Sequence, residues 1–139
     1  MKHHHRNPRA RGGRKRQPSR RDPLIGFEAP VTIEQVGARG DGIAHVQAPD
    51  GKSVLVYVDC VLPGDEVRVA LRQKRGDGYG AEVIEELKRS PAFNPPRCSH
   101  FKECGGCALQ HMNDDDYRAW KHDKARTAVL RAGIDPEDA

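Results

Sequence analysis

The sequence predicts a mainly β fold, in which a small five-stranded barrel precedes an irregular cysteine-rich loop and one C-terminal α-helix. Between residues 28 and 88, short apolar runs alternate with Gly, Pro and Asp, a pattern typical of consecutive antiparallel strands. Three of the four cysteines lie within ten residues, 98–107. A chain of 139 residues has room for one small domain and an appendage, but not for a large catalytic fold as well.

The first segment, residues 1–24, is predicted to be a disordered basic arm. Residues 1–22 carry nine Lys and Arg side chains against one acid and no Val, Ile, Leu or aromatic residue, so they cannot form a core. Residues 23–139 hold 15 basic and 19 acidic groups and sum to −4. A basic arm of this kind binds phosphates without reading sequence. His3, His4 and His5 leave open a solubilising tail or an expression remnant, but three histidines are fewer than a usual tag.

The sequence contains no apolar stretch of the roughly 18–20 residues that a membrane span needs. No apolar signal region follows the basic start. We therefore expect a soluble cytoplasmic protein without a membrane partner, and nothing in the sequence indicates an oligomer.

The five expected strands connect through recognisable turns. Asp50-Gly51 is predicted to form a hairpin turn with positive φ values, and Pro63-Gly64 suits the centre of a type II turn. Residues 54–58 are apolar on both faces, which predicts a buried central strand. Short strands at this spacing indicate a small closed or nearly closed barrel of the oligonucleotide-binding type, with almost no helix between 28 and 88. The strand segments are 31–36, 43–46, 54–58, 67–72 and about 79–87.

Three segments of the barrel resemble a TRAM domain, an RNA-binding β-barrel found on RNA-modifying enzymes. They are Gly40-Asp41-Gly42-Ile43-Ala44, the strand 54–58, and Val61-Leu62-Pro63-Gly64-Asp65-Glu66-Val67. A barrel of this type presents basic groups to phosphates and planar side chains to bases. The RNA-binding candidates are Arg72, Lys74 and Arg75, in the expected loop before the last strand, with Tyr79 nearby. For each of them a solvated loop charge is the alternative interpretation.

An irregular cysteine loop is predicted for residues 95–112, and its cysteines Cys98, Cys104 and Cys107 follow the spacing C-x5-C-x2-C. In a reducing compartment, clustered thiols indicate metal binding rather than a disulfide. Gly105 and Gly106 let the backbone turn tightly, so that two thiolates can converge on one centre. Thiolates suit an iron–sulfur cluster or zinc.

Three local thiolates leave the fourth ligand open. His111 would complete a Cys3His zinc site. Cys60 is a second candidate, although a cysteine between a central strand and a turn is more often a small buried apolar residue. The third possibility is a ligand beyond residue 139.

Residues 98–111, CSHFKECGGCALQH, closely resemble the cluster motif of the RNA (uracil-5-)-methyltransferases. These enzymes methylate uridine in ribosomal RNA with S-adenosylmethionine (SAM). The resemblance, which runs from about Glu28 to Ala132, implies a TRAM domain and a four-iron four-sulfur cluster on Cys98, Cys104 and Cys107. It also implies a fourth cysteine much later in the chain, His111 as a non-ligand, and SAM bound only by a separate Rossmann-like domain.

The chain departs from that family pattern after Cys107. It has no later cysteine, no glycine-rich cofactor loop after a strand, and no assignable catalytic cysteine or acid. Gly76 to Gly80 are expected to form a hairpin turn rather than a dinucleotide cradle. We therefore assign no catalytic residue, and expect a truncated product or partial sequence that is inactive alone.

A helix is predicted for residues 113–133. Asn113 or Asp114 can cap its start, Gly133 can end it in a left-handed conformation, and Pro136 prevents continuation. Tyr117 and Trp120 are expected to pack against the cysteine loop or another domain, and stacking of Trp120 on an RNA base is the alternative. The later basic residues Lys121, Lys124 and Arg131 can contact phosphates or remain solvated.

Three functions follow from these features. The chain can be the RNA-recognition portion of a uridine methyltransferase, with ribosomal RNA as partner and a structural cluster. It can instead be a free-standing RNA-binding or RNA-chaperone module. Finally, it can be a small Cys3His zinc protein that binds RNA.

Overall fold

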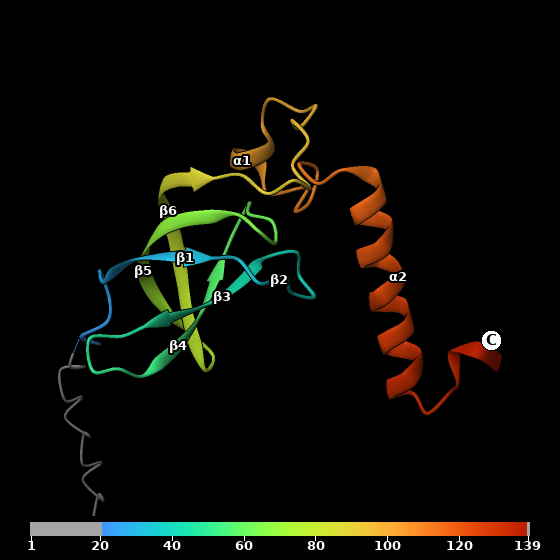
Figure 1. Cartoon of the computed structure of the whole chain (residues 1–139), viewed down its shortest axis with the longest axis horizontal. Helices are drawn as coiled ribbons and strands as arrows, with labels where there is room; N and C mark the ends of the chain where they lie inside the picture. Colours follow the sequence, from blue (N-terminus) through green and yellow to red (C-terminus); the bar gives the residue numbers. More distant parts are fainter. Residues whose placement is uncertain (1–20, 139) are drawn as a thin grey trace, which may run out of the picture.

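The computed structural model describes residues 21–138, so residues 1–20 of the predicted basic arm lie outside the described part. The mainly β prediction is confirmed, with six strands instead of five and no helix between 28 and 88 (Figure 1). The strands are β1 (Glu28–Thr32), β2 (Gln35–Val36), β3 (Gly42–Gln47), β4 (Ser53–Val58), β5 (Glu66–Arg75) and β6 (Gly78–Lys88). They are followed by α1 (Phe101–Cys104), α2 (Asp114–Arg131) and the short 3₁₀ helix η1 (Pro136–Asp138).

The sheet has the order β1-β5-β6-β4-β3-β2, and only the pair β4 and β6 is parallel. Its first and last strands, β1 and β2, are separated in the chain by just Ile33 and Glu34. The sheet therefore curls until its two ends meet, and β1 lies against β3. Within residues 21–138 no strand ladder joins β1 to β2, so the curled sheet is not hydrogen-bonded into a complete barrel.

The predicted single strand 31–36 is wrong, because the chain changes partners at its centre. The N–H of Ile33 donates to the Asp65 carbonyl at 2.9 Å, and the N–H of Glu34 donates to the Ile43 carbonyl at 2.9 Å. The Ile33 side chain is 1% exposed and closes the core at this crossing. One apolar run thus forms two strands.

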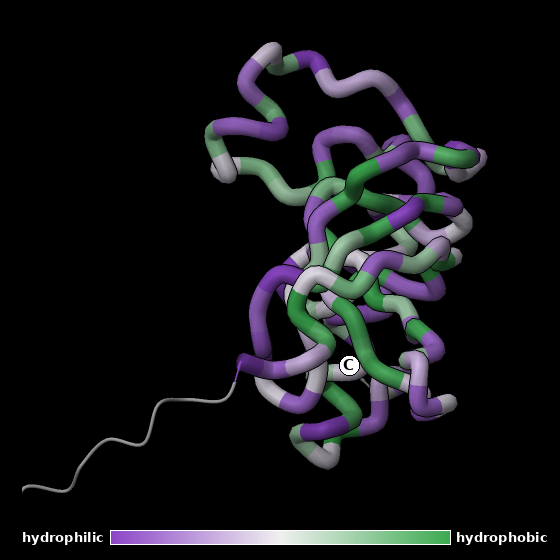
Figure 2. The backbone as a smooth tube through the Cα atoms, turned by 90° about the vertical axis from the view of Figure 1, so that its left-hand side faces the viewer, coloured by the Kyte–Doolittle hydropathy of each residue, from purple (hydrophilic) through white to green (hydrophobic). Residues whose placement is uncertain are grey.

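The core fills the inside of the curled sheet with branched aliphatic side chains. Val56, Val58, Val69 and Leu71 are fully buried, as expected for β-branched and aliphatic residues on the inner face of a pleated sheet. Hydrophobic and hydrophilic residues alternate along the chain in Figure 2. The central position predicted for residues 54–58 is confirmed, since β4 lies between β6 and β3.

The type II turn at Pro63-Gly64 is supported by a positive φ of 91° at Gly64 and by a 3.0 Å bond from the Asp65 N–H to the Leu62 carbonyl. The prediction for Asp50-Gly51 is wrong in part. Gly51 has φ +83°, but Asp50 does not have a positive φ. The N–H of Gly51 donates to the Ala48 carbonyl at 2.9 Å, which makes a three-residue hairpin loop ending in a left-handed glycine.

The predicted C-terminal helix is confirmed as α2. The side chain of Asn113 caps it by accepting a 2.9 Å bond from the Asp116 N–H, and Gly133 follows it with φ +78°. Tyr117 and Trp120 pack against a second apolar cluster, and the indole N–H of Trp120 donates to the Val36 carbonyl at 3.4 Å. That cluster consists of Val36 from β2, Leu62 from the turn between β4 and β5, and Leu109 and Met112 from the cysteine loop. The rest of α2 extends away from the sheet.

Candidate nucleic-acid interface and cysteine loop

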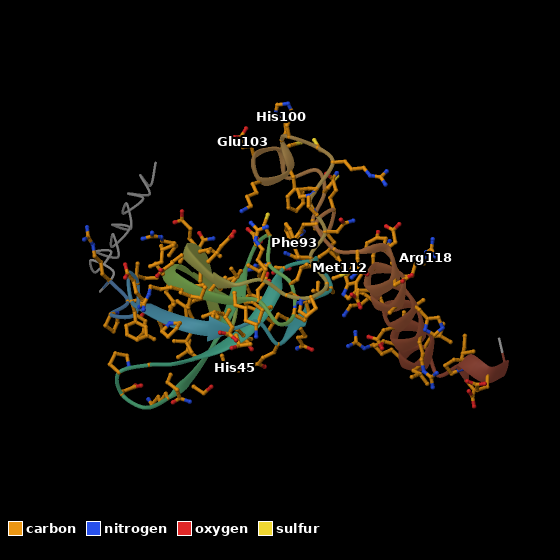
Figure 3. All side chains as sticks on the ribbon, turned by 45° about the horizontal axis from the view of Figure 1, so that its top comes forward. His45, Phe93, His100, Glu103, Met112 and Arg118 are labelled. Carbon is orange, nitrogen blue, oxygen red and sulfur yellow. The ribbon has the colours of Figure 1, made fainter. Side chains whose placement is uncertain are left out.

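The cysteine-rich segment is a loop closed at its base. Phe93 and Met112 form an antiparallel bridge, and the N–H of Asn94 donates to the His111 carbonyl at 2.8 Å. His100 and Glu103 lie at the far tip of this loop, while Phe93 and Met112 lie at its base (Figure 3). The loop predicted for residues 95–112 is therefore held at both ends, which limits the conformations of the cysteines between them.

The three thiols of the motif are exposed in the distal part of the loop. The helix α1 ends at Cys104, and Gly105 turns the chain with φ +69°. A Cβ on Gly106 would lie 3.4 Å from the Cys104 sulfur, so this glycine lies directly beside the thiol. Iron–sulfur clusters are bound by cysteine thiolates, so three exposed thiols on a short glycine-containing turn are chemically suitable as ligands. Within residues 21–138, no three His, Cys, Asp or Glu side chains are already placed to hold one metal ion.

Neither local candidate for the fourth ligand lies with the cysteine triplet. Cys60 is half-buried in the turn after β4, where it has φ +59°, and burial followed by the nearby Asp59 charge raises the pKa of its thiol. Cys60 and His111 line the same cleft, whereas Cys107 lines a different one. The zinc alternative, which needs His111 beside the three cysteines, gains no support from this placement.

His111 occupies an unusual environment. Its side chain is 3% exposed, its ring lies 4.8 Å from the Phe101 ring, and neither ring nitrogen has a hydrogen-bond partner. Burial lowers the pKa of His111, against the opposing influence of the Asp65 carboxylate and of a backbone contact at Val61 that does not reach full hydrogen-bonding geometry. The imidazole is therefore neutral near pH 7.

The cleft that His111 lines has a volume of about 630 Å³ and lies between β6 and the cysteine loop. At its edge, Glu86 accepts 3.3 Å hydrogen bonds from both Lys102 and Arg89. The bond from Lys102 lowers the pKa of Glu86, and Arg89 adds to that effect. The guanidinium of Arg89 also lies 4.2 Å from the centre of the Phe93 ring. These contacts connect the end of β6 to the cysteine loop.

The basic candidates Arg72, Lys74 and Arg75 lie within β5, not in a loop, which corrects the predicted location. Arg72 is paired with Glu82 at 2.8 Å, and Arg75 is paired with the buried Asp41 at 2.6 Å. Strand pairing continues to Arg75 because β6 begins immediately after the turn.

Tyr79 is buried in the main core, with 5% of its surface exposed. Its hydroxyl donates to the Asp22 carboxylate, and the Lys74 amine lies 4.4 Å from the ring centre. This hydrogen bond raises the pKa of Tyr79 and lowers the pKa of Asp22. In this conformation the Tyr79 ring has no open face on which a base could stack.

Tyr57 is the aromatic residue that sequence reasoning missed. Its half-exposed ring lies 4.6 Å from the Arg75 guanidinium, and its hydroxyl donates to Asp77 at 3.3 Å. The signal was present in the sequence, since Tyr57 alternates with the core residues Val56 and Val58. The structure thus joins Arg75 to a different tyrosine from the predicted one.

Among residues 21–138, no helix is both long enough and apolar enough to cross a membrane.

No protein-family model matches the sequence. Curated relatives do match it: an uncharacterized RNA methyltransferase of Brucella suis is 43% identical over 109 residues, covering 78% of this chain and 24% of the relative. A 23S rRNA (uracil(1939)-C(5))-methyltransferase RlmD of Methylococcus capsulatus is 38% identical over 114 residues, covering 82% of this chain and 25% of the relative. The RlmD of Vibrio campbellii is 34% identical over 122 residues, covering 87% of this chain and 27% of the relative.

The chain thus spans about a quarter of the length of the curated relatives it matches. The match lies in their N-terminal part and includes most of the residues that the structure describes. By sequence, the chain is a relative of the RNA methyltransferases, a group that includes 23S rRNA uracil-5 methyltransferases, and it corresponds to their N-terminal part.

Proposed function

We propose that this chain is the RNA-binding portion of a SAM-dependent RNA (uracil-5-)-methyltransferase that acts on ribosomal RNA. The observation that carries the proposal is the identity of 34–43% with proteins named RNA methyltransferases over most of the chain. Methyl transfer and SAM binding belong, in this proposal, to the remaining three quarters of the relatives' length. The part described here recognises the RNA.

The basic side chains of β5 and the neighbouring Tyr57 support RNA binding by the curled sheet. Arg75 is held by Asp41 and by the Tyr57 ring, so its guanidinium is positioned before any ligand arrives. A positioned guanidinium loses less conformational freedom on binding a phosphate than a free one does. The basic residues of the N-terminal arm add attraction that does not depend on sequence.

We further propose a four-iron four-sulfur cluster on Cys98, Cys104 and Cys107, with a structural role. The loop that carries them has few buried side chains, and Phe101, Leu109 and Met112 are its buried apolar residues. A cluster bound to three thiolates would cross-link parts of the loop that apolar packing does not hold together. When bound, the cluster supplies no step of methyl transfer in this proposal.

RNA binding by the full 139-residue chain tests the proposal. Fluorescence anisotropy with a uridine-containing hairpin of 23S rRNA is expected to give an affinity that falls steeply as salt rises, because phosphate contacts release counterions. Replacing Arg75 with Ala is expected to weaken binding about fivefold or more, since it removes a charged contact.

The matched control for this substitution is Arg126→Ala, which removes an exposed arginine on α2 whose carboxylate partner lies 3.9 Å away. Its expected effect on RNA affinity is less than about twofold. Absence of RNA binding at 50 mM salt, with the basic arm intact, contradicts the proposal.

A further inference from the structure

The cleft between β6 and the cysteine loop has the dimensions of a ligand site. Its volume of about 630 Å³ falls within the roughly 300–1,000 Å³ of typical small-ligand pockets. Phe93 and Phe101 form part of its apolar wall, and His111 lines it together with Cys60. None of these residues belongs to β5 or to the triplet Cys98, Cys104 and Cys107.

His111 gives this cleft an unused hydrogen-bonding group. His111 is buried, and in the described part of the chain no group lies in hydrogen-bonding geometry with either of its ring nitrogens. Buried polar groups are almost always hydrogen-bonded, and an unsatisfied one calls for a specific explanation. A neutral imidazole offers one donor and one acceptor. The two nitrogens point away from each other across the ring, so one edge of a ligand can bond one of them.

The charges around the cleft do not repel an RNA strand as strongly as the count of carboxylates suggests. Glu82 is paired with Arg72, and Glu86 is shared by Lys102 and Arg89. Glu85, which also lines the cleft, is paired with Arg68, and the exposed Asp59 is a further carboxylate among the lining residues. The Asp65 carboxylate accepts hydrogen bonds from two backbone N–H groups. The edge formed by Lys102, Glu86 and Arg89 therefore carries one more positive charge than negative, which suits a phosphate next to an inserted base.

We propose that this cleft binds one unstacked nucleobase of the RNA, with the polar edge of the base directed at His111 and the flanking phosphate at Lys102 and Arg89. The inference rests on the proposed RNA-binding function and assigns to it a specific base-binding site. Proteins recognise single-stranded RNA by this combination of aromatic walls, an arginine plane and hydrogen bonds to the base edge. Because both His111 nitrogens are buried, the neighbouring side chains have to shift before the edge of a base can reach one of them.

An added polypeptide strand fits the cleft less well. In the pairing of β5 with β6, Val69 lies opposite Val83 and Arg68 opposite Glu85, so Ile84 is an extra bulged residue. A bulge interrupts the regular spacing of backbone groups that strand addition requires. The exposed side chain of Ile84 widens the apolar wall instead.

The test uses His111→Leu in the full chain, with His122→Leu as the matched control, because His122 is an exposed histidine on α2. Leucine removes the two unpartnered nitrogens and keeps an apolar side chain of similar size, so the urea midpoint of folding is expected to stay the same or rise. Affinity for an unstructured oligouridylate decamer is expected to fall about tenfold in His111→Leu. Less than a twofold change is expected in His122→Leu.

A second measurement does not depend on substitution. The NMR signals of the His111 imidazole are expected to shift on addition of the decamer, and to stay unchanged on addition of inorganic phosphate alone. If RNA binds with equal affinity to both variants and these signals do not move, the base-binding site is overturned while the proposed RNA-binding function stands. If the signals move with oligolysine and not with RNA, the cleft is a polypeptide site. If RNA does not bind the unmodified chain at all, both proposals fail.

Discussion

Gly40, in the loop between β2 and β3, lies directly against Ala108 of the cysteine loop, and a Cβ on Gly40 would be 2.5 Å from the Ala108 Cβ. Gly40 also has φ +86°, which L-residues with a side chain rarely adopt. The residue next to it, Asp41, holds Arg75. This contact therefore places the cysteine loop against the segment that positions the principal basic side chain of the candidate RNA surface.

Replacing Gly40 with Ala is expected to destabilise the fold by about 2–5 kcal/mol, the sum of backbone strain and overpacking against Ala108. Urea denaturation followed by circular dichroism measures the change. The control is Gly51→Ala: Gly51 has a similar φ of +83° but no atom within 4 Å of the added Cβ, so only about 1–2 kcal/mol of strain is expected. Equal losses of unfolding free energy in the two variants would show that overpacking against Ala108 does not contribute to the destabilisation.

Asp65 connects the turn before β5 to the end of β6. Its carboxylate accepts bonds of 2.7 Å from the Leu62 N–H and 2.6 Å from the Ser90 N–H. Asp65→Ala leaves both part-buried donors without a partner, and we expect a loss of about 1.5–3 kcal/mol in unfolding free energy. Asp50→Ala removes one 3.0 Å bond to Lys52 in an exposed turn and is expected to cost about 1 kcal/mol. A milder effect at Asp65 than at Asp50 contradicts this account.

The hydrogen bond from Tyr79 to Asp22 is expected to make stability depend on pH. It lowers the pKa of Asp22 below the usual 3.8, so the unfolded chain takes up a proton more readily than the folded chain as the solution is acidified. The stability that Asp22 contributes is therefore present above about pH 4 and is lost as pH falls through the folded-state pKa. Tyr79→Phe should flatten the dependence of the urea midpoint between pH 5 and pH 2.5. An unchanged slope in Tyr79→Phe shows that the bond is absent in solution.

Metal content separates the roles of the four cysteines. Protein purified without oxygen is expected to be brown and to contain iron and acid-labile sulfide. Cys98→Ser, Cys104→Ser and Cys107→Ser should each lose most of both, because the proposed cluster is held by these three exposed thiols of one loop. Cys60→Ser and His111→Leu are expected to keep both iron and sulfide, since Cys60 and His111 line the cleft between β6 and the cysteine loop. With three local thiolates the cluster should be lost in air, and zinc in place of iron would contradict the assignment.

Local sequence patterns predicted the elements whose bonding partners are near in the chain. The Pro63-Gly64 turn is one example, because its geometry follows from the fixed φ of proline and the freedom of glycine. The capping of α2 by Asn113 is another, because donor and acceptor are three residues apart. Two of the predictions that failed concern distant partners: Glu34 leaves the β1–β5 pairing to bond Ile43 of β3, and Arg75 extends β5 because β6 is there to pair with it.

The amino-acid sequence by itself determined the mainly β architecture, the spacing of three thiols on one loop, and the relation to RNA methyltransferases, because alternation, turn residues and motif spacing are local properties. Only the tertiary structure decided that Tyr79 lies inside the core while Tyr57 accompanies Arg75. It alone placed His111 in a cleft separate from the one that Cys107 lines. Burial and side-chain neighbours depend on how segments that are distant in the chain pack together. Local sequence patterns do not reveal that packing.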